Sequence, residues 1–159
     1  MSETPKVQPI PEGYHTITPY LYVDGAADAL AFYREALGAE ELFRLDAGNG
    51  KLGHAEMQIG DSRFMLADEF DEWDNRSPRT LGGNGSALML YVENVDDAFE
   101  RAVNAGAQVV MPVTNHFYGD RSGMVEDPFG HRWMLSTHIE DVPPDEIDRR
   151  MKEAMAQDG

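Results

Sequence analysis

An internal repeat constrains the fold of this 159-residue chain more than any other feature of its sequence. Two strings recur 69 positions further along the chain, in the same order: Leu21–Val23 recurs as Leu90–Val92, and Arg63–Leu66 recurs as Arg132–Leu135, with Trp in place of Phe. Between these strings, Gly38-Ala39 recurs as Gly106-Ala107 after 68 positions. Matches in one order at a nearly constant offset predict two copies of a single structural unit.

Each copy has the pattern of a strand, a helix and three further strands. Apolar segments at 17–23 and 87–93 predict the first strands, and Ala-rich segments with apolar residues at helical spacing predict helices that end at Gly38 and Gly106. The later strands are expected at 41–45, 52–59 and 63–68 in the first copy, and at 108–113, 123–126 and 132–138 in the second. Gly60–Ser62 and Asp127–Gly130 have the composition of turns. The sequence therefore predicts an α+β fold of two tandem β-α-β-β-β modules.

The predicted modules divide the chain into five parts. These parts are an extended N-terminal arm (1–13), the first module (14–68), a polar, Gly-rich linker (69–85), the second module (86–139) and a C-terminal tail with a short helix (140–159). In the tail, Ile147, Met151 and Met155 form an apolar stripe at intervals of four residues. We expect this stripe to dock on the body of the protein or on a second subunit.

The charge and composition of the chain narrow the choice of partners. The 13 Lys and Arg residues against 29 Asp and Glu give a net charge of −16, which disfavours nucleic acid and anionic lipid. The same charge attracts a cationic ligand, or simply keeps the protein soluble. The absence of cysteine excludes disulfides, thiolate metal ligands and a cysteine nucleophile. No signal-peptide pattern or membrane-length apolar run is present, so we expect a cytoplasmic protein.

Several phrases of the sequence resemble the vicinal-oxygen-chelate superfamily, which includes glyoxalases, bleomycin resistance proteins and dioxygenases. The phrases are Ile17–Leu21, Ala31–Tyr33, Gly53–Glu56, Phe117–Gly123 and Asp127–Trp133, and they look most like the PhnB-like subgroup. The resemblance implies that the modules form a curved, mixed eight-stranded sheet around a cavity. It also implies a homodimer, in which domain swapping through the linker is an open alternative. Because members of this superfamily differ in chemistry, the resemblance specifies the fold more closely than the reaction.

The resemblance also identifies where a metal would be expected. In the metal-dependent members, each module supplies one ligand from its first strand and one from its last. The corresponding positions in this chain are Thr18, Met65, Ala87 and Met134. A divalent catalytic ion needs imidazole or carboxylate ligands, which a thioether and a methyl group do not replace. We therefore predict no metal at the usual positions and no cofactor, with a divalent ion at a relocated site as the alternative.

Strand alternation then predicts which side chains face the expected cavity. The predicted lining is rich in Tyr and Met: Thr18, Tyr20, Tyr22, Met65, Met89, Tyr91 and Met134. Aromatic rings stack on flat ligands and Met adapts its shape, so this lining suits a small aromatic or amphipathic molecule. The alternative is that these side chains fill a collapsed cavity or are covered by a dimer partner.

Four ionisable residues are candidates for a chemical role. His54 and Glu56 alternate on one strand and could form an acid–base pair, half of a metal site or a structural hydrogen bond. His138, at the end of the last strand, could reach the same cavity mouth. By the resemblance, Arg121 lies near the cavity rim, where it would bind a carboxylate or phosphonate oxygen or pair with a neighbouring acid such as Asp120.

These features lead to three functional hypotheses. The first is a small-molecule binder without the usual metal ligands. The second is a metal-dependent lyase, isomerase or dioxygenase with a relocated site around His54, Glu56 and His138. The third is an interaction module whose cavity is filled.

Overall fold

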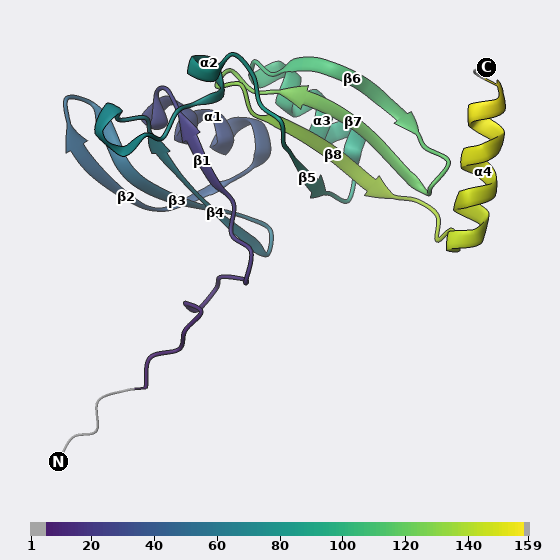
Figure 1. Ribbon diagram of the computed structural model, residues 1–159, viewed down its shortest axis with the longest axis horizontal. Coiled ribbons are helices and arrows are strands. Elements are labelled where there is room, and N and C mark those ends of the chain that lie inside the picture. Colours follow the sequence, from purple (N-terminus) through teal and green to yellow (C-terminus); the bar gives the residue numbers. More distant parts are fainter. Residues whose placement is uncertain (1–5, 158–159) are drawn as a thin grey trace. The chain divides into compact units, whose positions relative to one another are not determined.

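The computed structural model describes residues 6–157 and divides the chain into two compact units after Thr80 (Figure 1). The first unit contains β1 (Tyr20–Val23), α1 (Ala26–Leu37), β2 (Glu40–Gly48), β3 (Lys51–Ile59), β4 (Ser62–Asp68), the 3-10 helix η1 (Asp71–Trp73) and most of α2 (Pro78–Leu81). The second unit contains β5 (Ala87–Tyr91), α3 (Val95–Ala105), β6 (Gln108–Asn115), β7 (Asp120–Glu126), β8 (Arg132–His138) and α4 (Pro144–Gln157).

Each unit holds one four-stranded sheet, and the two sheets have the same topology. Their strand orders are β1-β4-β3-β2 and β5-β8-β7-β6. In each sheet the first strand runs parallel to the last, and the other pairs are antiparallel. Tyr20 is the register partner of Met65, and Met89 is the register partner of Met134. The repeat and the α+β architecture are therefore confirmed, as two four-stranded mixed sheets.

One helix packs against one face of each sheet and leaves the other face open. Leu30 and Tyr33 of α1 are fully buried, and the Tyr33 ring meets Phe64 of β4 edge-on at 5.7 Å between ring centres. Burying a large apolar side chain contributes about 1.5–3 kcal/mol. On β1, Leu21 is buried beneath the helix while Tyr20 is 41% exposed. This alternation, which the strand pattern predicted, gives each sheet a covered face and an open face.

The start of the helix in each unit is held by a side chain from the last strand. Asp68 of β4 is buried, and its Oδ1 accepts hydrogen bonds from the backbone N–H groups of Gly25 and Ala26 at 2.8 Å. Thr137, the equivalent residue of β8, accepts the N–H of Val95 at 2.9 Å. These side chains satisfy donors at the helix N-terminus that have no partner within the helix. Each of these two residues lies 42 positions from the helix residue whose N–H it accepts, so the local sequence pattern does not predict the contacts.

Several strand boundaries differ from the sequence prediction: β2 extends to Gly48 rather than 45, β6 extends to Asn115 rather than 113, and β5 ends at Tyr91 rather than 93. The strand β1 begins at Tyr20 rather than at residue 17, because Pro19 before it has no N–H to donate to a ladder. The strand β7 begins at Asp120 rather than at 123, since Asp120 is paired with His138 of β8. The predicted hairpin at Gly60 is confirmed: Ile59 pairs with Ser62, and Gly60 has a positive φ of 57°.

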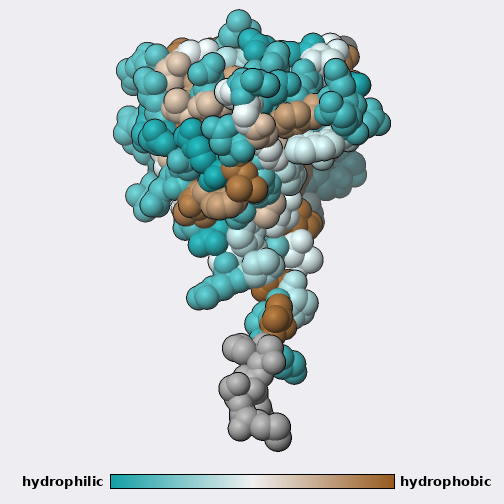
Figure 2. Space-filling model, turned by 90° about the vertical axis from the view of Figure 1, so that its left-hand side faces the viewer, coloured by the Kyte–Doolittle hydropathy of each residue, from teal (hydrophilic) through white to brown (hydrophobic). Residues whose placement is uncertain are grey.

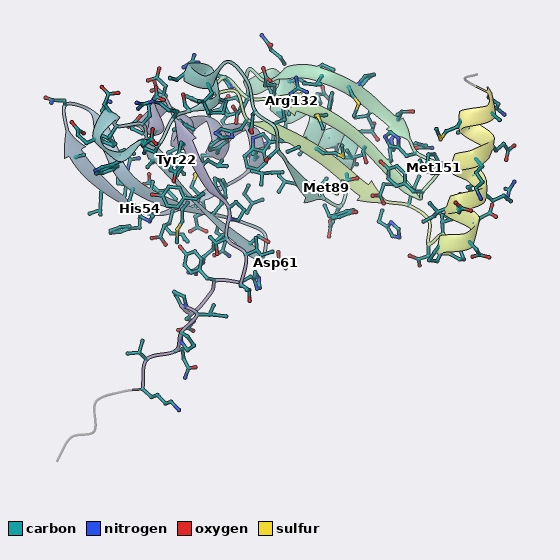
Figure 3. All side chains as sticks on the ribbon, viewed as in Figure 1. Tyr22, His54, Asp61, Met89, Arg132 and Met151 are labelled. Carbon is teal, nitrogen blue, oxygen red and sulfur yellow. The ribbon has the colours of Figure 1, made fainter. Side chains whose placement is uncertain are left out.

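The C-terminal helix α4 contacts the rest of the second unit through few side chains. Arg150 donates to the carbonyl oxygen of Phe117 at 2.9 Å and pairs with Glu140. No residue of α4 is buried, and Met151 and Met155 remain 48% and 65% exposed; Met151 is labelled in Figure 3. The second unit therefore covers these two side chains only in part. On the face drawn in Figure 2, hydrophobic side chains lie exposed in small patches among hydrophilic ones. Within residues 6–157, no helix is long and apolar enough to cross a membrane.

Candidate functional site

The open face of the second sheet carries a continuous row of four methionines. Met89 is paired with Met134, Met134 with Met124, and Met124 with Met111. One methionine thus comes from each strand, and Met89 and Met111 are 44% and 40% exposed. Met89 is labelled on β5 in Figure 3. This row is a flexible, polarizable apolar surface across the whole width of the sheet.

Two polar rows follow the methionine row toward the carboxyl end of β8. The first consists of hydroxyl-bearing residues, one from each strand: Tyr91, Ser136, Ser122 and Thr114. Ser122 and Ser136 are buried and joined by a hydrogen bond. The second row is the Asp120–His138 pair. His138 lies four residues beyond Met134 on the same strand, roughly 13 Å at 3.3 Å per residue.

The second polar row opens into a pocket of about 510 Å³ in the second unit. The pocket is lined by two aromatic rings, three polar groups and an aliphatic wall: Tyr91, Tyr118, Asp120, His138, Asp141, Val142, Pro143 and Ile147. The aliphatic wall comes from the segment that leads into α4 and from its first turns. A polar end and an apolar side in one pocket suit an amphipathic molecule.

Hydrogen bonds fix the polar groups of this pocket. His138 is held between two carboxylates, with Nδ1 at 2.7 Å from Oδ1 of Asp120 and Nε2 at 2.7 Å from Oδ1 of Asp141. Hydrogen bonding to Asp120, and next to Asp141, raises the pKa of His138. The Tyr91 hydroxyl donates to the other Asp120 oxygen at 3.0 Å, and this bond raises the pKa of Tyr91. The Asp120 side chain is only 7% exposed, whereas Asp141 is fully exposed.

The equivalent row of the first sheet has different chemistry. It runs from Tyr20 through Met65 and Glu56 to Phe43. His54 lies beside it on β3, opposite Leu45 of β2. Tyr22 and His54 are labelled on this sheet in Figure 3. Phe43 and Leu45 are 46% and 53% exposed. Together with Glu56, they make this open face partly apolar and partly charged.

A hydrogen-bonded chain connects three of the predicted site residues on the first sheet. The Tyr20 hydroxyl lies 2.8 Å from Nδ1 of His54, and Nε2 of His54 lies 3.0 Å from Oε2 of Glu56. The side chains of His54 and Glu56 are each 22% exposed. Partial burial, and next the neighbouring Tyr22 hydroxyl, raise the pKa of Tyr20. This arrangement can pass a proton along three groups.

The four positions that correspond to the family's metal ligands do not form a donor set for a hard divalent ion. Thr18 precedes β1, and its hydroxyl donates to the carbonyl oxygen of His15 at 3.2 Å. Met65 and Met134 offer only thioether sulfur, and Ala87 offers no donor. Among the described residues, no group of three or more His, Asp or Glu side chains could hold a metal ion.

The structure also shows where the other predicted site residues lie. Arg121 forms a two-pronged pair with Asp96 of α3 and donates to Asn115, so its guanidinium is engaged within the second unit. Sequence reasoning missed Met111 and Met124. They stand 68 residues after Phe43 and Glu56, an offset already present between the two copies, but the register shifts in β6 conceal this correspondence.

Comparison with known proteins agrees with the fold. Residues 13–135 match the Glyoxalase/Bleomycin resistance protein/Dioxygenase superfamily. An uncharacterised protein of Mycobacterium bovis is 41% identical over 138 residues, which cover 85% of this chain and 91% of that protein. The crystal structure of TioX from Micromonospora sp. ML1 is similar with a TM-score of 0.63 and 24% identity, over 79% of this chain and 99% of TioX. The X-ray structure of a gene product of Arabidopsis thaliana is similar with a TM-score of 0.62 and 28% identity. The match covers 77% of this chain and 98% of the Arabidopsis chain.

Proposed function

The chain belongs to the Glyoxalase/Bleomycin resistance protein/Dioxygenase superfamily, and we propose that within it this protein binds a small amphipathic molecule. The ligand lies on the open face of the second sheet. The pocket lined by Tyr91, Asp120 and His138 is the observation that carries this proposal. We also infer membership of the PhnB-like subgroup, which the phrases Phe117–Gly123 and Asp127–Trp133 support.

The methionine row supports an apolar, flat ligand body. Met89, Met134, Met124 and Met111 present thioethers and methylene groups over four adjacent strands, about 4.8 Å apart from strand to strand. Sulfur makes favourable contacts with aromatic rings, and Met side chains adjust to the outline of a ligand. An exposed apolar surface ordered in this way is typical of a binding site.

The charges of the pocket support a basic group on the ligand. Asp120 and Asp141 carry two negative charges, which a protonated His138 offsets only in part. The Tyr91 and Tyr118 rings stand beside these carboxylates, and aromatic faces attract organic cations. A net charge of −16 over the chain adds a long-range attraction for such a ligand.

A fluorescence titration with proflavine, a planar cationic dye, tests this proposal. Asp141→Asn removes one negative charge from the pocket, and Asp145→Asn removes one from the same tail outside it. We expect saturable binding that Asp141→Asn weakens two- to fivefold, which is the effect of one solvent-exposed ion pair, while Asp145→Asn leaves it unchanged. The neutral ring system acridone should bind more weakly than proflavine.

A second pair of variants tests the apolar part of the site. Met124→Ala should weaken proflavine binding at least fourfold, because each methylene group lost from the contact costs about 0.8 kcal/mol. Met151→Ala, on α4 and outside both the methionine row and the pocket, should have no effect. Equal affinities within both pairs of variants, or dye binding that never saturates, would refute the proposed site.

A further inference from the structure

We propose that Tyr20, His54 and Glu56 form an acid–base site on the first sheet that moves a proton to and from a carbon atom next to a carbonyl group. This activity goes beyond ligand binding and belongs to the other unit of the chain. The site uses no metal ion, so it also differs from the relocated metal centre that the sequence left open.

A neutral His54 ring gives the two hydrogen bonds one consistent direction. An ionised Glu56 carboxylate only accepts hydrogen bonds, so the neutral His54 ring carries its proton on Nε2, 3.0 Å from Glu56. The bare Nδ1 then accepts the hydrogen bond from the Tyr20 hydroxyl at 2.8 Å. The phenol oxygen is the free end of the chain, on a side chain that is 41% exposed on the open face. A base, an orienting carboxylate and an exposed hydroxyl in line are the parts of an activated hydroxyl group.

The proposed step needs no co-reactant. The C–H bond of the substrate breaks, and its proton goes to Oη of Tyr20 while the Tyr20 proton moves to Nδ1 of His54. The electron pair of the C–H bond becomes that of an enolate, and the resulting imidazolium is stabilised by Glu56. Return of a hydrogen exchanged with solvent at the exposed Tyr20 hydroxyl to the same carbon gives exchange, and return of the proton to a second carbon gives an isomer. A phenol of ordinary pKa is already protonated at neutral pH, and the pKa of Tyr20 is raised further by burial, so Tyr20 carries its proton before the substrate binds.

The side chains around Tyr20, His54 and Glu56 favour a substrate with an aromatic or apolar part. The Tyr22 ring lies 5.4 Å from the Tyr20 ring, and the Phe43 ring lies 6.4 Å from the His54 ring, measured between ring centres. Both rings are partly exposed, Tyr22 by 39% and Phe43 by 46%. A flat carbonyl compound can stack on them with its acidic carbon at Tyr20.

The second sheet shows that the fold does not require the hydrogen-bonded residues Tyr20, His54 and Glu56. The positions equivalent to Tyr20 and Glu56 hold Met89 and Met124, which have the same register partners in the other sheet. A sheet of the same topology therefore forms with methionines in their places. A partly buried His–Glu pair costs desolvation and side-chain entropy that methionine avoids, so its presence is better explained by chemistry than by folding.

Hydrogen–deuterium exchange into small ketones tests the proposal. The full-length protein is incubated in D₂O with phenylacetone or 2-indanone, and loss of the α-proton signal is followed by ¹H NMR. We expect the wild type to accelerate exchange of at least one ketone over buffer, and Tyr20→Phe and His54→Gln each to lower the acceleration at least tenfold, the low end of general acid–base effects. Tyr14→Phe is the matched control, because it removes a hydroxyl of the same unit that forms no hydrogen bond among the described residues and lies outside the proposed site, and it should retain the acceleration.

Three results would overturn the proposal: no acceleration of either ketone by the wild type, equal rates for the wild type and folded Tyr20→Phe, or an equal loss in Tyr14→Phe. Circular dichroism establishes that each variant is folded, and His54→Gln gives a second test if Tyr20→Phe is not. Asp141→Asn should exchange the ketones at the wild-type rate, so the test is independent of the dye-binding site in the second unit.

Discussion

Replacement of Asp68 by Ala should destabilise the first unit more than any other single side-chain truncation at a helix start of this chain. Its Oδ1 accepts the N–H groups of Gly25 and Ala26 at 2.8 Å, and its Oδ2 accepts the N–H of Leu52 at 2.7 Å. The Ala26 and Leu52 bonds are buried. Hydrogen bonds to charged groups contribute about 1.5–3 kcal/mol each, and counting the two buried ones gives a loss of about 3–5 kcal/mol after the relief of carboxylate desolvation.

Thr137→Ala provides the matched comparison in the second unit. Thr137 accepts one N–H, from the buried Val95, through a neutral hydroxyl, so its loss should cost only about 1–2 kcal/mol. Asp68→Asn should cause a loss of stability between those of Asp68→Ala and Thr137→Ala. The Asn amide keeps one acceptor oxygen but turns an N–H₂ group toward a backbone N–H donor. Hydrogen-exchange mass spectrometry measures opening of α1 and α3 separately, without assuming that the whole chain unfolds in one step. A cost below about 1.5 kcal/mol for Asp68→Ala, or a larger cost for Thr137→Ala, would refute the assignment of these caps.

Three further predictions concern the second unit. The folded pKa of His138 is raised, so the stability that its pairs contribute is fully present below the unfolded pKa of about 6.5 and is lost as the pH rises through the folded pKa. The difference in urea midpoint between the wild type and His138→Gln should therefore shrink from pH 6 to pH 9. A constant difference would contradict the pairing. Gly119 has a φ of +104°, and a Cβ there would overlap the carbonyl oxygen of Glu140, so Gly119→Ala should cost about 2 kcal/mol or more in a urea melt. Asp127 accepts the N–H groups of Phe129 and His131 and the indole N–H of Trp133, so Asp127→Ala should lower the urea midpoint more than the exposed Asp148→Ala.

Much of the scaffold follows from local sequence signals. Both predicted helices end at glycines in left-handed or positive-φ conformations, Gly38 at φ 69° and Gly106 at φ 123°. Such a position depends on the residue itself, because only glycine adopts it without a Cβ penalty. The burial of Phe64 and Trp133 likewise follows from strand alternation. These features are encoded by residues close together in the chain, so a single sequence is enough to predict them.

The less predictable features depend on contacts between distant residues. The methionine row includes Met111 only because β6 has register shifts between Val109 and Met111 and between Met111 and Thr114. A bulge changes the face to which each later residue points, and the sequence carries no clear signal for it. The partner of Arg121 is Asp96, 25 residues away on α3. The sequence left open whether this arginine binds a ligand or pairs with an acid, and only the packing of α3 shows which acid is in reach.

The two copies keep the same scaffold and differ on their open faces. Asp68 and Thr137 hold the start of the helix from the same position of the last strand, although one is charged and one is neutral. On the open faces, by contrast, aromatic and ionisable residues of the first sheet stand where the second sheet has methionines. If open-face residues served only to fill space, apolar side chains would suffice in both sheets, because a desolvated polar pair gives less stability than well-packed apolar groups. The difference is explained if one unit contributes proton transfer and the other contributes an apolar, acidic binding surface. Variants confined to one open face should then change exchange or dye binding, and never both.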